Sequence, residues 1–182
     1  MTRAELGRAL REAAYLEGEF VLRSGRRSRY YLDKYRFETR PDLLGPLGER
    51  IAAAVAEHEP EASRLAGPEL GAVPLAAAAS LSSGLPFVIV RKGAKDYGTA
   101  NRLEGLYEPG ETVCLVEDVV TSAGAAIDAI EALRAAGLTC RTAICVVDRE
   151  EGGADALARH GVRLRPLFRA RELLEAGRDA GG

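Results

Sequence analysis

The spacing of apolar residues changes character along the N-terminal part of the chain. Leu6, Leu10 and Ala13 recur at helical spacing, which predicts a helix over about residues 4–17. Residues 18–35, GEFVLRSGRRSRYYLDKY, predict two short strands around a basic Ser-Gly turn. An apolar stripe over about residues 42–57, after a proline, predicts a second helix.

The second half of the chain alternates short apolar runs with helical patterns. The strand-like runs are SRLAG, PFVIV, TVCLVED, TCRTAICVVDR and VRLRPLF, and the helical segments are VPLAAAASLSSG, AAIDAIEALRAAG, ADALARHG and ARELLEAG. Such alternation predicts βαβ units. We therefore expect an α/β fold with a mostly parallel central sheet flanked by helices.

Polar loops follow four of these predicted strands. Their sequences are GPELGA, RKGAKDYGTANRLEG, EDVVTSAG and DREEGG. Ligands of open α/β sheets bind beyond the carboxyl ends of the strands. Because the four loops would meet at that edge, we expect the site there.

Composition narrows the class of protein. The chain has 182 residues, 47% of them hydrophobic and 29% charged, with a formal net charge of −2. This predicts a globular domain with neither a nucleic-acid nor a membrane partner, and the absence of an apolar leader predicts a cytoplasmic location. The three cysteines have neither metal-ligand nor redox spacing, so we expect buried thiols.

Two adjacent acids, Glu117 and Asp118, interrupt the most hydrophobic stretch of the chain. Burying them is costly unless a cation or a hydroxyl-rich ligand meets them. The turn that follows, Thr121 to Ala125, has small residues and hydroxyls before a predicted helix, which suits a phosphate. A phosphorylated sugar would satisfy both features, and Mg²⁺ could bridge its oxygens. The alternative is a plain turn in which Thr121 caps the helix.

Basic residues follow two of the strands. Arg91, Lys92, Lys95 and Arg102 lie in a long glycine-bearing loop and suit a polyphosphate, although such a loop can also be a solvated face. Arg149 follows another strand. It could hold a planar carboxylate or carbonyl edge of a second substrate, or pair with the acids beside it.

These motifs resemble a known family. CLVEDVVTSAGAA is similar to the ribose-phosphate signature of type I phosphoribosyltransferases. The segments FVLRSGRRSRYYLDKY, GPELGAVPLA, RKGAKDYGTANRLEG and VVDREEGG stand in the order and spacing of the orotate phosphoribosyltransferases. The resemblance covers roughly residues 18–155.

The resemblance implies a reaction and an architecture. Orotate and phosphoribosyl pyrophosphate would give orotidine monophosphate and pyrophosphate, with Mg²⁺ carried by the substrate, in pyrimidine (UMP) synthesis. The fold would be the type I phosphoribosyltransferase fold, with residues 1–40 as a hood over the base and residues 41–182 as the core. The protein would be a homodimer whose basic loop, about residues 92–105, reaches the neighbouring site.

The resemblance also implies roles for individual residues. Catalysis would fall to Lys95, Lys92, Asp118 and Glu117, with the cations stabilising the leaving pyrophosphate and the acids fixing the ribose hydroxyls. The residues expected to bind phosphoribosyl pyrophosphate are Arg91, Lys92, Lys95, Tyr97, Glu117, Asp118, Val119, Val120, Thr121, Ser122, Ala123, Gly124 and Ala125. Those expected to bind orotate are Thr121, Arg149, Arg23, Tyr30 and Tyr31.

Three positions depart from the family pattern. Tyr97 replaces a usual histidine, and Arg23 stands where some relatives have lysine. Ala123 replaces a common glycine, so we expect that this backbone position does not need a positive φ.

Three other functions stay open. The enzyme could use another base such as a purine, although Arg149 and the RYYLD segment favour an anionic pyrimidine. A regulator that only senses phosphoribosyl pyrophosphate, or a sugar-phosphate binding module without turnover, would use the same fold. The near-neutral charge predicts no DNA binding, which a regulator would show.

Overall fold

A six-stranded sheet forms the centre of the computed structural model, which describes residues 1–21, 25, 27–93 and 102–175. The strand order is β5-β4-β3-β6-β7-β8, and every neighbouring pair is parallel except β4 and β5. The strands are β3 (Arg64–Pro68), β4 (Phe87–Val90), β5 (Leu103–Glu104), β6 (Thr112–Val120), β7 (Thr139–Asp148) and β8 (Arg163–Arg169). The predicted α/β fold is confirmed, although β5 was not predicted.

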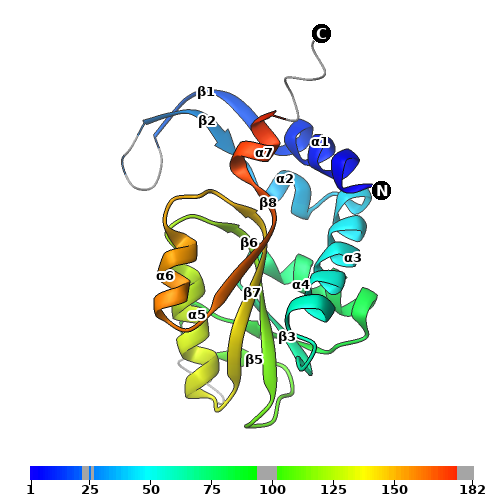
Figure 1. Ribbon diagram of the computed structural model, residues 1–182, viewed down its shortest axis with the longest axis vertical. Coiled ribbons are helices and arrows are strands. Elements are labelled where there is room, and N and C mark those ends of the chain that lie inside the picture. Colours follow the sequence, from blue (N-terminus) through cyan, green and yellow to red (C-terminus); the bar gives the residue numbers. More distant parts are fainter. Residues whose placement is uncertain (22–24, 26, 94–101, 176–182) are drawn as a thin grey trace.

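Helices cover both faces of this sheet (Figure 1). α3 (Pro41–His58) and α4 (Ala72–Ser83) lie on one face, and α5 (Gly124–Ala135) and α6 (Gly153–Arg159) lie on the other. Two hydrophobic cores exist, and successive residues of β6 alternate between them. Cys114 and Val116 belong to one core, and Val113 and Leu115 belong to the other. A strand buried on both faces has no polar alternation, which explains the continuous apolar run. The three cysteines are buried and free, as predicted.

A smaller unit lies where the parallel strands end (Figure 1). It contains α1 (Arg3–Ala14), the antiparallel hairpin β1 (Tyr15–Val21) and β2 (Arg27–Leu32), α2 (Tyr35–Glu38) and α7 (Ala170–Glu175). A capping box between Thr2 and Glu5 starts α1. The prediction that this helix continues to about residue 17 was wrong, because Tyr15 already pairs with Leu32 in the hairpin.

The connections leave the sheet centre in opposite directions. From β3 the chain moves outward to β4, whereas β6 continues through β7 to β8 on the other side. The gap between the ends of β3 and β6 is therefore the topological switch point, where α/β sheets bind ligands. Among the described residues, no helix is both long and apolar enough to cross a membrane.

Candidate active site

The acids at the end of β6 are buried at the switch point. Glu117 is 7% exposed and Asp118 is 4% exposed. Within the described part of the chain, Glu117 Oε1 has no hydrogen-bond partner. Burial and the neighbouring Asp118 charge raise the pKa of Glu117 to about 8. A buried acceptor without a donor is a place for a ligand hydroxyl.

Asp118 forms an ion pair with Lys34, which lies between β2 and α2. Lys34 Nζ donates to Asp118 Oδ2 at 2.6 Å. Burial works against the charge of Lys34, but the hydrogen bond and the charge of Asp118 outweigh it and raise the Lys34 pKa. The Val119 N–H donates to Asp118 Oδ1. The pairing fixes the Asp118 carboxylate before any substrate arrives.

A third acid, Glu38 of α2, lies beside this pair, and sequence reasoning missed it. It is 1% exposed, and neither of its carboxylate oxygens receives a donor from the described residues. Burial and the charge of Asp118 raise its pKa to about 8. A lone acid in a predicted loop carries no sequence signal. Only the packing of α2 against the end of the sheet brings Glu38 to the site.

Gly71 makes room for these acids at the end of β3. A Cβ at this position would lie 2.1 Å from Asp118 Oδ2 and 2.8 Å from Glu38 Oε1. Gly71 is the N-cap residue of α4, and the Glu69–Leu70 peptide before it is cis. The loop after β3 and the acids near the end of β6 thus meet, as the sequence predicted.

The turn between β6 and α5 has the form expected of an anion site. Thr121 and Ser122 are exposed, and α5 begins at Gly124 without a side-chain cap on its first N–H groups. The alternative in which Thr121 caps the helix is therefore wrong. The expectation for Ala123 was also wrong, because its backbone has φ 65° and ψ 13°. The tight turn needs this left-handed conformation even without glycine.

The first residues of the basic loop are held by acids. Arg91 lies 3.9 Å from Glu69 and 3.7 Å from Glu104, and the Lys92 N–H donates to Glu69 Oε1 at 2.6 Å. Arg102 donates to the backbone carbonyl of Arg91 and forms an ion pair with α5. Arg102 therefore fixes the base of the loop. Lys95 and Tyr97, together with Arg23 in the hairpin, lie outside the described residues.

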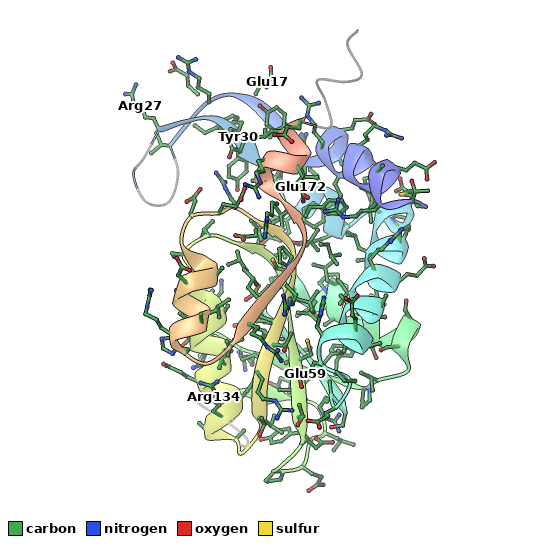
Figure 2. All side chains as sticks on the ribbon, in the orientation of Figure 1. Glu17, Arg27, Tyr30, Glu59, Arg134 and Glu172 are labelled. Atoms are coloured by element: carbon green, nitrogen blue, oxygen red, sulfur yellow. The ribbon has the colours of Figure 1, made fainter. Side chains whose placement is uncertain are left out.

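Arg149 lies at the end of β7, facing the hairpin. Its guanidinium stacks 5.2 Å above the ring of Tyr30, and it also pairs with Glu151 at 3.2 Å. Tyr30 lies between the hairpin and the sheet (Figure 2). Tyr31 instead packs against Phe20, because neighbouring residues of a strand point to opposite faces. The structure therefore brings Tyr30, but not Tyr31, to Arg149.

The donor set fits a divalent cation that arrives with a substrate. No group of three or more His, Cys, Asp or Glu side chains in the described ranges could hold a metal alone. Mg²⁺ commonly keeps its waters and binds substrate phosphates rather than a protein cage. The free acceptors here suit hydroxyls of a ligand that itself carries the ion.

The fold and the site together define a class. A parallel sheet whose central strand ends in two buried acids and an uncapped small-residue turn is the arrangement of the type I phosphoribosyltransferases. No family model matches the chain. It is 52% identical over 157 residues to the orotate phosphoribosyltransferase of Methanocella arvoryzae, covering 86% of this chain and 88% of the relative. The chain belongs to the orotate phosphoribosyltransferase family.

Solved structures agree. The orotate phosphoribosyltransferase of Aeropyrum pernix matches with a TM-score of 0.84 and 35% identity, covering 97% of this chain and 99% of that one. The Mycobacterium tuberculosis enzyme in complex with 5-phospho-α-D-ribosyl 1-diphosphate matches with a TM-score of 0.79 and 29% identity, covering 94% and 98%. The resemblance seen in the sequence is confirmed.

Proposed function

We propose that this chain transfers ribose 5-phosphate from phosphoribosyl pyrophosphate to orotate, giving orotidine 5′-monophosphate and pyrophosphate in pyrimidine synthesis. The membership of the chain in this family and one structural observation support the proposal. Buried acids with a free acceptor lie next to an uncapped helix N-terminus at the switch point of the sheet. A phosphorylated sugar satisfies both at once.

The ribose 5-phosphate would lie across the end of β6. Its phosphate would accept hydrogen bonds from the turn of Thr121 to Ala125, where the helix dipole also favours an anion. Its hydroxyls would donate to Glu117 and Asp118. Holding the sugar at both ends orients C1 toward the base and removes the entropy cost of finding that geometry during reaction.

The leaving pyrophosphate would lie toward the basic loop. As the bond to C1 breaks, positive charge develops on the ribose ring and negative charge on the pyrophosphate. Arg91 and Lys92 follow β4 directly and, with Lys95, would stabilise that negative charge. Mg²⁺, held by substrate oxygens, would neutralise part of it. Arg91 would exchange its ion pairs with Glu69 and Glu104 for the pyrophosphate.

The orotate would lie beneath the hairpin. Among the described residues, the Arg149 Nε has no hydrogen-bond partner, and its guanidinium stacks on Tyr30, so the group can receive a planar anion. A carboxylate is the group that separates orotate from uracil. This contact would select the base.

The dimer and the compartment are part of the proposal. The membership of the chain in the orotate phosphoribosyltransferase family supports a homodimer. The basic loop of one copy would reach the site of the other, in the cytoplasm.

One assay tests the reaction. Purified protein with phosphoribosyl pyrophosphate and Mg²⁺ is given orotate, uracil, adenine or hypoxanthine in turn, and base consumption and pyrophosphate release are followed. We expect turnover with orotate alone. Turnover with another base would overturn the proposal that orotate is the substrate. Binding of phosphoribosyl pyrophosphate without any turnover would favour a regulator that senses this compound.

A variant tests the base contact. Arg149→Met should raise KM for orotate by about 10-fold or more and leave KM for phosphoribosyl pyrophosphate unchanged, because a lost charge-assisted hydrogen bond costs about 1.5–3 kcal/mol. Arg159→Met is the matched control on α6, away from the site.

A further inference from the structure

Glu38 is a buried acid that the proposed reaction leaves without a role. Within the described part of the chain, it is the one residue with two buried carboxylate oxygens that lack any hydrogen-bond partner. It lies on α2, a helix of four residues, Tyr35–Glu38. A carboxyl group kept from water without a donor destabilises the fold. We therefore expect the buried Glu38 to have a role in the function of the site.

The position of Glu38 is defined by Gly71. A Cβ built on Gly71 would lie 2.8 Å and 2.9 Å from the two Glu38 oxygens and 2.1 Å from Asp118 Oδ2. The Glu38 and Asp118 carboxyl groups thus border the same space beside Gly71, and both the charge of Asp118 and a hydrogen bond with it raise the Glu38 pKa. Both are almost fully enclosed, so water does not separate their charges.

Two enclosed carboxyl groups in contact share a proton rather than both ionising. Lys34 decides which of them carries the negative charge. Its ammonium donates to Asp118 Oδ2 at 2.6 Å, and Glu38 has no comparable contact with it. The anion therefore belongs on Asp118, and the proton belongs on Glu38. A protonated Glu38 is a donor, and the carboxylate of Asp118 is the acceptor that it faces.

We propose that Glu38 is a positioning residue that donates a hydrogen bond to Asp118 and so fixes this carboxylate toward the ribose hydroxyls. The inference rests on the proposed function, because it deepens the role of the same ribose site. Lys34, the Val119 N–H and Glu38 then hold Asp118 from three sides. The substrate meets an acceptor that needs no reorganisation on binding.

A matched pair of substitutions tests the donor. Glu38→Gln keeps the shape and supplies an N–H donor, whereas Glu38→Met keeps the volume and removes the donor. We expect kcat/KM for phosphoribosyl pyrophosphate to stay within about 3-fold of wild type in Glu38→Gln and to fall about 10- to 100-fold in Glu38→Met, as for a misplaced group. KM for orotate should stay unchanged in both.

The pH profile gives an independent reading. Glu38 faces Asp118 from β6 and Lys34 and Asp33 from the chain before α2. In wild type, kcat/KM for phosphoribosyl pyrophosphate should decline as Glu38 loses its proton near pH 8. Glu38→Gln has no proton to lose and should lack that part of the decline. A residue with a purely structural role would leave the two profiles superimposable.

Controls separate the possible failures. Glu59→Met removes a buried acid at the other end of the sheet and should lower stability without changing KM for phosphoribosyl pyrophosphate. Equal loss in Glu38→Gln and Glu38→Met would show that Glu38 acts as an anion, and wild-type kinetics in Glu38→Met would show that it does nothing; either result overturns the inference. If wild type does not turn orotate over, the proposed function fails, and calorimetric binding of phosphoribosyl pyrophosphate to the same variants still tests Glu38.

Discussion

Two buried glutamates at opposite ends of the sheet have opposite environments. Glu59, 4% exposed, accepts from the Arg141 guanidinium at 3.1 Å and from the Thr142 hydroxyl at 2.8 Å. Glu38, 1% exposed, receives no donor on either oxygen from the described part of the chain. Figure 2 shows Glu59 far from Tyr30, which lies at the end of the molecule that holds the site.

The difference separates groups that stabilise the fold from groups that await a ligand. At the Glu59 end, each carboxylate oxygen has a protein donor, so the buried charge is compensated within the fold. At the Glu38 end, Glu117 keeps an acceptor that nothing in the described chain satisfies, and Glu38 has the Asp118 carboxyl group beside it instead of a donor. Proteins tolerate such unsatisfied groups where function needs them.

The strongest test fills the space that the acids share. Gly71→Ala places a methyl group 2.1 Å from Asp118 Oδ2 and 2.8 Å from Glu38 Oε1, so both acids must move. A displacement of this size should lower kcat/KM for phosphoribosyl pyrophosphate about 100-fold. Steady-state kinetics measure it. Gly45→Ala, whose new Cβ meets nothing within 4 Å, is the control and should keep full activity.

The next test compares the two glutamates directly. Glu59→Met leaves the buried Thr142 hydroxyl without its acceptor and should lower the free energy of unfolding by about 2–3 kcal/mol. Glu38→Met removes a buried acid that receives no donor from the described residues, so the relieved burial cost should offset the lost contact with Asp118 and leave that free energy unchanged or higher. Urea unfolding measures both. Equal destabilisation in the two variants would contradict the comparison.

The pH dependence of stability should be set by the buried acids of the active site. The pKa values of Glu38 and Glu117 rise from about 4.5 to about 8 in the folded state. The unfolded chain releases these protons first, so the stability that these two groups contribute should be greatest below pH 4.5. It should fall as pH rises toward 8, by up to about 5 kcal/mol for each group at about 1.4 kcal/mol per pKa unit.

Urea titrations at a series of pH values without substrate measure this slope. Glu38→Gln should reduce it, because glutamine does not titrate. Glu59→Gln is the matched control, since its carboxylate is compensated by Arg141 and Thr142. A slope that persists unchanged in Glu38→Gln would assign the titration to other groups.

The smallest effect concerns the backbone of the phosphate turn. Ala123 adopts φ 65°, a conformation that costs a residue with a Cβ about 1 kcal/mol or more. Ala123→Gly should therefore raise the melting temperature slightly and change kcat less than about 3-fold. Differential scanning calorimetry checks the first expectation. A clear loss of stability would show that the turn does not strain alanine.

Much of the fold was readable from local patterns. The alternation of apolar runs and helical patterns predicted the parallel strands, including TVCLVED, and the helices after β3, β6 and β7. The boundary of α1 was wrong because hairpin pairing overrode its helical pattern at Tyr15. α2 and β5 are too short to produce any period, so no sequence pattern could reveal them.

The sequence by itself determined which chemistry the site contains: two acids after a buried strand, a small-residue turn and a basic loop. The acids and the turn are local features, because the strand, the turn and the first residues of the helix are contiguous in the sequence. Only the tertiary structure decided that Glu38 and Lys34 meet Asp118, and that Gly71 leaves room for them. Such contacts join segments far apart in the chain. They depend on how the N-terminal unit packs on the sheet, which periodicity does not encode.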